Sequence, residues 1–102
     1  MKTDHFEQLY RGNYARLYYY AFRFVADEEA CRDIVNDVFE QAWKDREQLQ
    51  EATAVACLYT RTRNRCIDYL RHRQVEQQYA DFLRTLTSED PSIPPGEREE
   101  RV

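Results

Sequence analysis

The fold is decided by the stretch at residues 27–43, DEEACRDIVNDVFEQAW. Its apolar residues recur at steps of three and four, which is the spacing of one helix face. Asp27 predicts an N-cap, because its carboxylate can accept a hydrogen bond from a free backbone N–H, and Glu28 and Glu29 would follow at the positive end of the helix dipole. We therefore expect a helix from Asp27 to about Arg46. Its predicted core stripe is Cys31, Ile34, Val35, Val38, Phe39 and Ala42.

Helical periodicity also extends to either side of this stretch. A first helix is predicted from about Thr3 to Val25, and a third from about Ala54 to Tyr79, after a polar loop at Glu47–Thr53. The first helix carries an apolar stripe made of Phe6, Leu9, Tyr10, Tyr14, Leu17, Tyr18, Ala21 and Val25. The inner face of the third is predicted to contain Val55, Leu58, Tyr59, Thr62, Cys66, Tyr69 and Leu70.

The composition favours an all-α fold with three main helices in a compact bundle. Only 2 glycines and 3 prolines occur in 102 residues, which argues against a turn-rich β protein. A weak fourth helical stretch is predicted around residues 82–86, and the sequence after Thr87 has the Pro-rich, charged composition of a linker. We therefore divide the chain into a helical domain at residues 1–80 and an extension with linker at 81–102.

The sequence offers no motif for catalysis, for a metal or for another cofactor. It has no Gly-rich phosphate loop and no nucleophile elbow, and it lacks the Glu-x-x-His pairs of a di-iron bundle. His5 and His72 are isolated. Cys31, Cys57 and Cys66 form no C-x-x-C pair, which predicts three reduced thiols rather than a zinc site. We expect a binding protein that is not an enzyme.

The sequence predicts a cytoplasmic protein without membrane insertion. No apolar run approaches the roughly 20 residues that a membrane-spanning helix needs. The first residues, MKTDHFEQLY, lack the apolar region of a signal peptide.

Charge is divided between two neighbouring segments. Residues 27–51 hold nine acidic and three basic side chains, whereas residues 52–79 hold five basic and two acidic ones. The net charge of −4 conceals this division. Because salt screens surface charges beyond roughly 10 Å, each segment presents its own charge to a partner, and the basic segment predicts a nucleic acid.

The acidic residues of the second helix cluster on one side, which we call the acidic face. A helical wheel places there Asp33, Asn36, Asp37 and Glu40. Most such faces are simply solvated. Here Trp43 and Phe39 border the charges, and apolar anchors surrounded by complementary charges are typical of a protein interface. The acidic face therefore predicts a basic protein partner.

The outer side of the third helix forms a second predicted surface, which we call the basic face. It contains Arg61, Asn64, Arg65, Asp68, Arg71 and His72. Arginines can follow phosphates, and the Asn64 amide can pair with a base edge. Tyr59 and Tyr69 could stack on unpaired bases, or they could pack in the core, since both lie on the inner stripe.

These motifs together resemble region 2 of bacterial RNA polymerase sigma factors, in particular the extracytoplasmic-function group. The similarity runs from Phe6 to Arg73 and includes the DIVNDVF segment at 33–39, then Trp43, the Leu58-Tyr59 pair and the RNR and DYLR segments at 63–65 and 68–71. The order and spacing of these short motifs are more specific than any one of them.

The resemblance implies docking on the coiled-coil clamp helices of the polymerase β′ subunit. It also implies recognition and melting of the −10 promoter element, with a flipped base of the non-template strand held by the protein. Polymerase contacts would then come from Asp33, Asn36, Asp37, Glu40 and Trp43. DNA contacts would come from Arg61, Asn64, Arg65, Asp68 and Arg71, with the loop before the third helix. An anti-sigma factor is a further partner that the resemblance suggests.

The sequence departs from the family pattern at three places. Asn36 stands where glutamine is usual, Cys57 stands where an aromatic residue commonly precedes Leu58, and the Glu47–Thr53 loop is acidic and lacks the usual glycine. We find no match in this sequence to the helix-turn-helix domain that reads the −35 element in the family, and we expect residues 91–96, which resemble the linker, to lead to it. The alternative reading is a helical adaptor that binds only proteins through the acidic face. A helix-turn-helix repressor is less consistent with the sequence, because no short Gly-containing turn joins two suitable helices.

Overall fold

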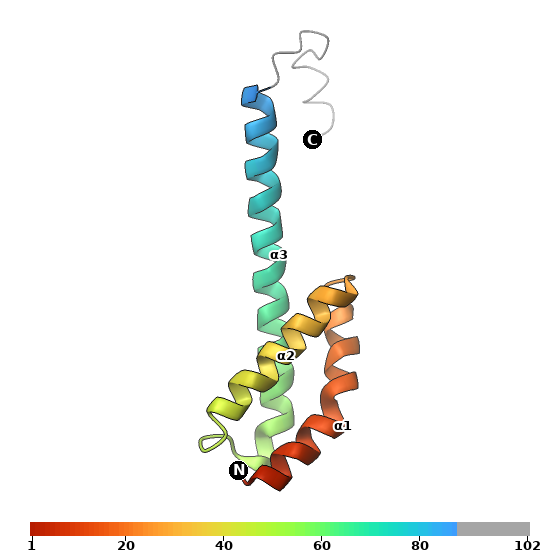
Figure 1. Ribbon diagram of the computed structural model, residues 1–102, viewed down its shortest axis with the longest axis vertical. Helices are drawn as coiled ribbons and strands as arrows, with labels where there is room; N and C mark the ends of the chain where they lie inside the picture. The colour runs from red at the N-terminus through yellow and green to blue at the C-terminus, as the bar shows by residue number, and fades with distance from the viewer. Residues whose placement is uncertain (88–102) are drawn as a thin grey trace. The chain divides into compact units, whose positions relative to one another are not determined.

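The computed structural model describes residues 1–87, and in these it contains helices and no strand. The elements are α1 (Thr3–Phe22), α2 (Glu28–Lys44), a single 3₁₀ turn η1 (Glu51–Thr53) and α3 (Ala54–Thr87). The all-α fold with three main helices is therefore confirmed (Figure 1). Contacts divide the chain into a first unit, Met1–Arg71, and a second unit, His72–Val102. The predicted linker after Thr87 lies outside the described residues, and the predicted division after residue 80 stays a prediction.

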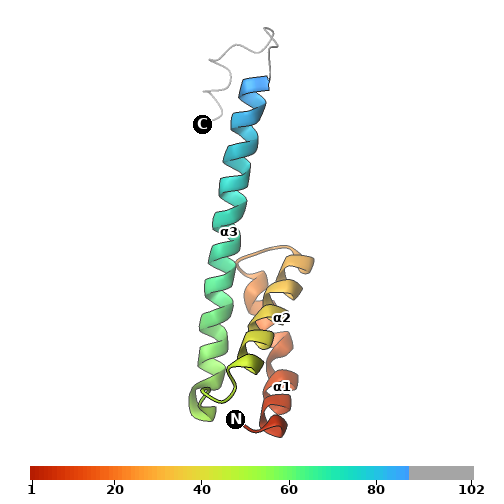
Figure 2. The same cartoon turned by 60° about the vertical axis from the view of Figure 1, so that its left-hand side comes forward.

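Within the first unit, α1 and α2 are joined by a short loop and pack against each other, and the first part of α3 lies alongside them (Figures 1 and 2). Asp27 is the N-cap of α2, as predicted: its carboxylate accepts a hydrogen bond from the Ala30 N–H at 3.0 Å. The first helix ends at Phe22, earlier than expected, because the N–H groups of Phe24 and Val25 both turn back to the carbonyl of Ala21 at 2.9 Å. Val25 nevertheless remains in the core.

The core is formed by one stripe from each helix. All six residues predicted for the α2 stripe are buried. The fully buried Leu17 of α1 and Leu58 of α3 complete the centre. Thr62 is also fully buried, which is compatible with a polar side chain because its hydroxyl donates to the Leu58 carbonyl at 2.8 Å.

The structure corrects the prediction for α3 in two respects. The helix continues without interruption to Thr87, so the expected fourth stretch is the end of α3 and not a separate helix. Val55 and Leu70, predicted to face inward, are each 42% exposed. The buried stripe follows Ala54, Leu58, Thr62 and Cys66 at steps of four, which leaves Val55 one position off the packed face. Leu70 continues the steps of four, but it lies one turn beyond Cys66, the last buried residue of the described part of α3.

Candidate functional site

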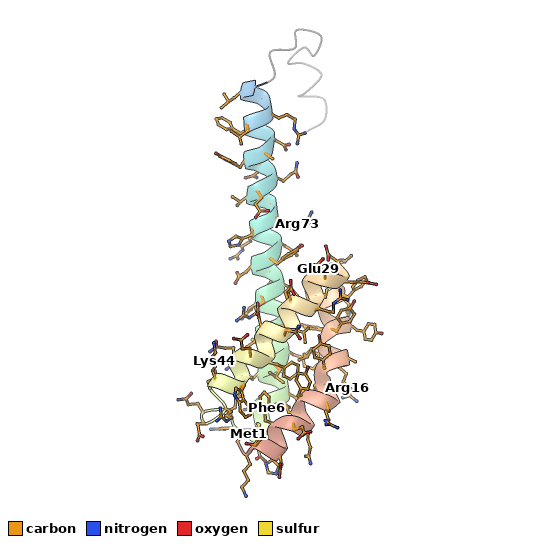
Figure 3. The ribbon with its side chains drawn as sticks, in the orientation of Figure 1. Met1, Phe6, Arg16, Glu29, Lys44 and Arg73 are labelled. Atoms are coloured by element: carbon orange, nitrogen blue, oxygen red, sulfur yellow. The ribbon has the colours of Figure 1, made fainter. Side chains whose placement is uncertain are left out.

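The acidic face lies along the exposed side of α2. Asp33, Asn36, Asp37 and Glu40 are all exposed, on consecutive turns of the helix. Glu40 pairs with Lys44 at 3.2 Å. Asp33 and Asp37 line a pocket of about 400 Å³, to which α3 contributes Tyr69. In Figure 3, Glu29 and Lys44 mark the two ends of this helix.

Trp43 lies at the end of the acidic face and is 38% exposed. Its ring centroid is 5.1 Å from that of Phe6 on α1, which Figure 3 labels, and the Arg46 guanidinium lies over the indole at 3.9 Å from the centroid. Phe39, which we placed in the core stripe but also expected to border the charges beside Trp43, is only 3% exposed, because Tyr10 and Tyr14 of α1 cover it. The apolar part of this surface is therefore Trp43 together with aromatic residues of α1.

The contribution of α1 to this surface was missed by sequence reasoning. Tyr10 is 42% exposed, with its ring centroid 4.8 Å from Phe39. The Tyr14 hydroxyl donates to the Asn36 side-chain oxygen at 3.1 Å, and partial burial raises the pKa of that hydroxyl, which keeps it protonated. The i, i+4 spacing of Phe6, Tyr10 and Tyr14 was visible in the sequence, but the α2 residues that they contact were not.

The basic face of α3 has lost part of its expected charge to pairs within the protein. Asn64, Asp68 and Arg71 are exposed. Arg65 lies 3.7 Å from the carboxylate of Asp37, so it connects the basic face with the acidic face. The two charged surfaces are thus adjacent along α2 and α3.

Arg61 is held most firmly among the predicted DNA-contacting arginines. Its two terminal nitrogens lie 3.3 and 2.8 Å from the two carboxylate oxygens of Asp45, at the C-terminal end of α2. Hydrogen bonding to Asp45 raises the pKa of the guanidinium. Both side chains are only about one-quarter exposed, at 27% for Arg61 and 26% for Asp45.

The loop between α2 and α3 covers a second pocket, of about 230 Å³. Its walls combine polar and charged side chains with Cys57 and with Leu49, which is 9% exposed and belongs to the core. His5 of α1 pairs with Glu51 at the far side of the loop. The pocket is lined by Asp45, Gln48, Leu49, Gln50, Thr53, Cys57 and Arg61.

Tyr59 and Tyr69 are partly buried and pack against the core. The Tyr59 ring meets Tyr20 of α1 edge to face, with centroids 4.9 Å apart. Packing against α1 therefore explains the position of the Tyr59 ring, and stacking on a DNA base is not needed to explain it. Tyr69 in addition lines the pocket beside Asp33 and Asp37.

The three cysteines are free thiols, with Cys31 and Cys66 buried and Cys57 partly buried. Burial raises the pKa of Cys66 to about 11, and the neighbouring Cys31 adds to this.

Within residues 1–87, no group of three or more His, Cys, Asp or Glu side chains is arranged to hold a metal ion. No helix in the same range is long and apolar enough to cross a membrane.

The fold and these surfaces define a helical binding domain with two adjacent faces of opposite charge. The family model of Sigma-70 region 2 matches residues 9–76, which is more than half of the chain. The chain therefore belongs to the Sigma-70 region 2 family, whose members act in transcription initiation by binding RNA polymerase core and promoter DNA, and which is not an enzyme family. Comparisons with curated proteins and with solved structures give no match.

Proposed function

We propose that the acidic face docks on the coiled-coil clamp helices of the polymerase β′ subunit, and that the basic face with the α2–α3 loop recognises and melts the −10 promoter element. The observation that carries the proposal is the adjacency of two oppositely charged exposed faces, joined at Asp37 and Arg65, in a chain of this family. A protein with these partners would work in the cytoplasm. The extracytoplasmic-function subgroup and an anti-sigma partner stay predictions.

The acidic face suits a basic helical partner. Asp33, Asp37 and Glu40 supply charge at successive turns, and complementary charge favours fast and selective association. Trp43 and Tyr10 supply exposed aromatic surface beside them. Aromatic anchors of this kind contribute a large share of the binding energy at protein interfaces.

The promoter side combines phosphate contacts with a pocket. Arg71 is exposed and Arg65 is partly exposed on α3, where each can meet a phosphate, while Asn64 can meet a base edge. The loop pocket would accept a flipped base, because Gln48, Gln50 and Thr53 offer donors and acceptors for its edge. Single-stranded DNA is the natural ligand for such a site.

Equilibrium titration of the chain with labelled oligonucleotides tests the proposal, in the presence and absence of polymerase core. We expect core to bind the chain, and the complex to prefer a single strand selected from a random pool over the same sequence as a duplex. Binding should weaken with salt, since arginine–phosphate contacts release counterions. Core binding without any salt-dependent strand binding would instead support the adaptor function and contradict the promoter half of the proposal.

A further inference from the structure

The Asp45–Arg61 ion pair closes the base of the α2–α3 loop. Asp45 is the residue at which α2 ends, and Arg61 lies two turns into α3. The two side chains meet in a bidentate pair, with nitrogen–oxygen distances of 3.3 and 2.8 Å. A bidentate arginine–carboxylate pair fixes orientation as well as distance, so the end of α2 is held against α3.

The loop itself has few means of keeping its conformation. Its backbone hydrogen bonds are local, from the Gln48 N–H to the Asp45 carbonyl at 2.9 Å and from Thr53 to Gln50 at 3.1 Å. Longer-range attachment comes from the buried Leu49, from the His5–Glu51 pair, from the amino group of Met1 on the Arg46 carbonyl, and from Arg61. Of these, Leu49 and the Arg61 pair lie in the wall of the loop pocket, and the Arg61 pair is the one made by charged groups.

Arg61 is poorly placed to hold a phosphate as well. Both terminal nitrogens face the Asp45 oxygens, and the side chain is 27% exposed. Turning it outward would leave the Asp45 carboxylate in the pocket wall without its partner, which costs free energy. The pair is also neutral as a whole, so it adds little to the positive potential that attracts DNA.

We propose that Arg61 is a positioning residue that sets the shape of the loop pocket through Asp45, and that it governs sequence preference instead of contacting phosphate. This inference rests on the proposed promoter-reading function of the loop. It revises the role that the sequence analysis gave to Arg61, while Arg65 and Arg71 keep theirs.

The first part of the proposal, that Arg61 holds the loop through Asp45, is tested without DNA, by hydrogen exchange of the backbone amides at 46–53 in the full chain. We expect Arg61→Ala to speed exchange about fivefold, as for loss of one ion pair. The swapped double variant Asp45→Arg/Arg61→Asp should restore slow exchange, and the matched control Arg71→Ala should leave it unchanged. Unaltered exchange in Arg61→Ala would overturn the positioning role whatever the DNA result.

The second part, that Arg61 governs sequence preference, is tested with the chain bound to polymerase core and a short single strand of DNA selected from a random pool. Arg61→Ala should reduce the affinity ratio between selected and scrambled strands, with the salt slope unchanged. Arg71→Ala should lower the slope by about 0.7, the value for one phosphate contact to a single strand, with the ratio unchanged. A slope lowered equally by Arg61→Ala would overturn the inference. If the wild-type chain binds no strand, the proposed function fails, and the exchange result still decides whether Arg61 holds the loop.

Discussion

The guanidinium of Arg65 on α3 lies 3.7 Å from the carboxylate of Asp37 on α2. Because Asp37 belongs to the acidic face and Arg65 to the basic face, this pair is the line where the two surfaces meet. The Arg65 side chain is 41% exposed and the Asp37 side chain is 58% exposed. Water therefore weakens the pair, and either residue can exchange it for an external partner. Residues away from this line, such as Asp33 and Arg71, give cleaner tests of each face alone.

Charge reversal on the acidic face should weaken polymerase binding without unfolding the protein. Asp33→Arg removes one complementary charge and adds a repulsive one, at an exposed position where substitutions usually change stability by within about 0.5 kcal/mol. Asp37→Arg should act in the same direction, and it also places a like charge beside Arg65. Pull-down with the β′ coiled coil measures the effect.

The control for this experiment is Glu76→Arg, an equal change of charge at an exposed position in the second unit. It should leave binding to the coiled coil near the wild-type value. Retention by the Asp33 and Asp37 variants equal to that of the control would contradict the docking surface.

Trp43 should become buried when polymerase core binds. It is the one tryptophan of the sequence and is 38% exposed, so its fluorescence reports on this surface alone. Adding a coiled-coil fragment without tryptophan should shift its emission to shorter wavelength. An emission maximum unmoved at saturating partner would show that the indole lies outside the interface.

Asn64 should contribute to sequence preference more than to total affinity. An amide that reads a base edge discriminates between bases by about 1–3 kcal/mol. Asn64→Ala should therefore reduce the preference for selected over scrambled strands, whereas Arg71→Ala should weaken both alike. Equal loss for both strands in Asn64→Ala would remove base readout from its role.

Gly12→Ala should stabilise the protein by about 0.5–1 kcal/mol, because glycine in a helix costs about that much relative to alanine. Gly12 lies inside α1, and an added Cβ would meet nothing within 4 Å. Urea unfolding measures the gain. The matched control is Ala15→Gly, an exposed position on the same helix, which should lose a similar amount. Destabilisation by Gly12→Ala would contradict the open space found around this position.

Stability should fall as pH rises from 9 to about 11, because burial raises the pKa of Cys66 to about 11 from the ordinary value of 9. Between these values the unfolded chain loses the Cys66 thiol proton at lower pH than the folded protein does, so deprotonation favours unfolding. Below pH 9 the thiol is protonated in both states, and its contribution to the free energy of unfolding is fully retained. The raised pKa values of Tyr14 and Tyr18 act in the same direction from about pH 10, the ordinary value for tyrosine. Urea midpoints across this range should fall less steeply in Cys66→Ser, whose hydroxyl does not ionise there; identical slopes would exclude Cys66 as the cause.

The α2 helix could be predicted from sequence almost residue by residue. Its N-cap at Asp27 and its buried stripe depend on local rules of spacing and capping, which operate within a few residues. The exposure of Asp33, Asn36, Asp37 and Glu40 follows from the same wheel. The charged part of the candidate docking surface could therefore be predicted from helical periodicity alone.

The remainder depends on contacts between distant parts of the chain. The Asp45–Arg61 pair could not be predicted, because it requires the end of α2 and the second turn of α3 to lie together. The same holds for the Tyr14–Asn36 hydrogen bond, which joins α1 to α2. For Val55, periodicity identified an apolar face but not its rotation by one residue, which is set by packing against α1 and α2.

The thiols of Cys31 on α2 and Cys66 on α3 are held by carbonyls at the end of α1, which leaves Cys57 as the thiol suited to labelling. The Cys31 thiol donates to the Val25 carbonyl at 2.9 Å, and Cys66 lies 3.9 Å from the Ala21 carbonyl, so both sulfurs are occupied inside the core. Cys57 alone is partly accessible, and it lines the loop pocket. A small thiol-reactive probe would thus attach at the pocket in the unmutated chain, and its signal would follow strand entry in real time.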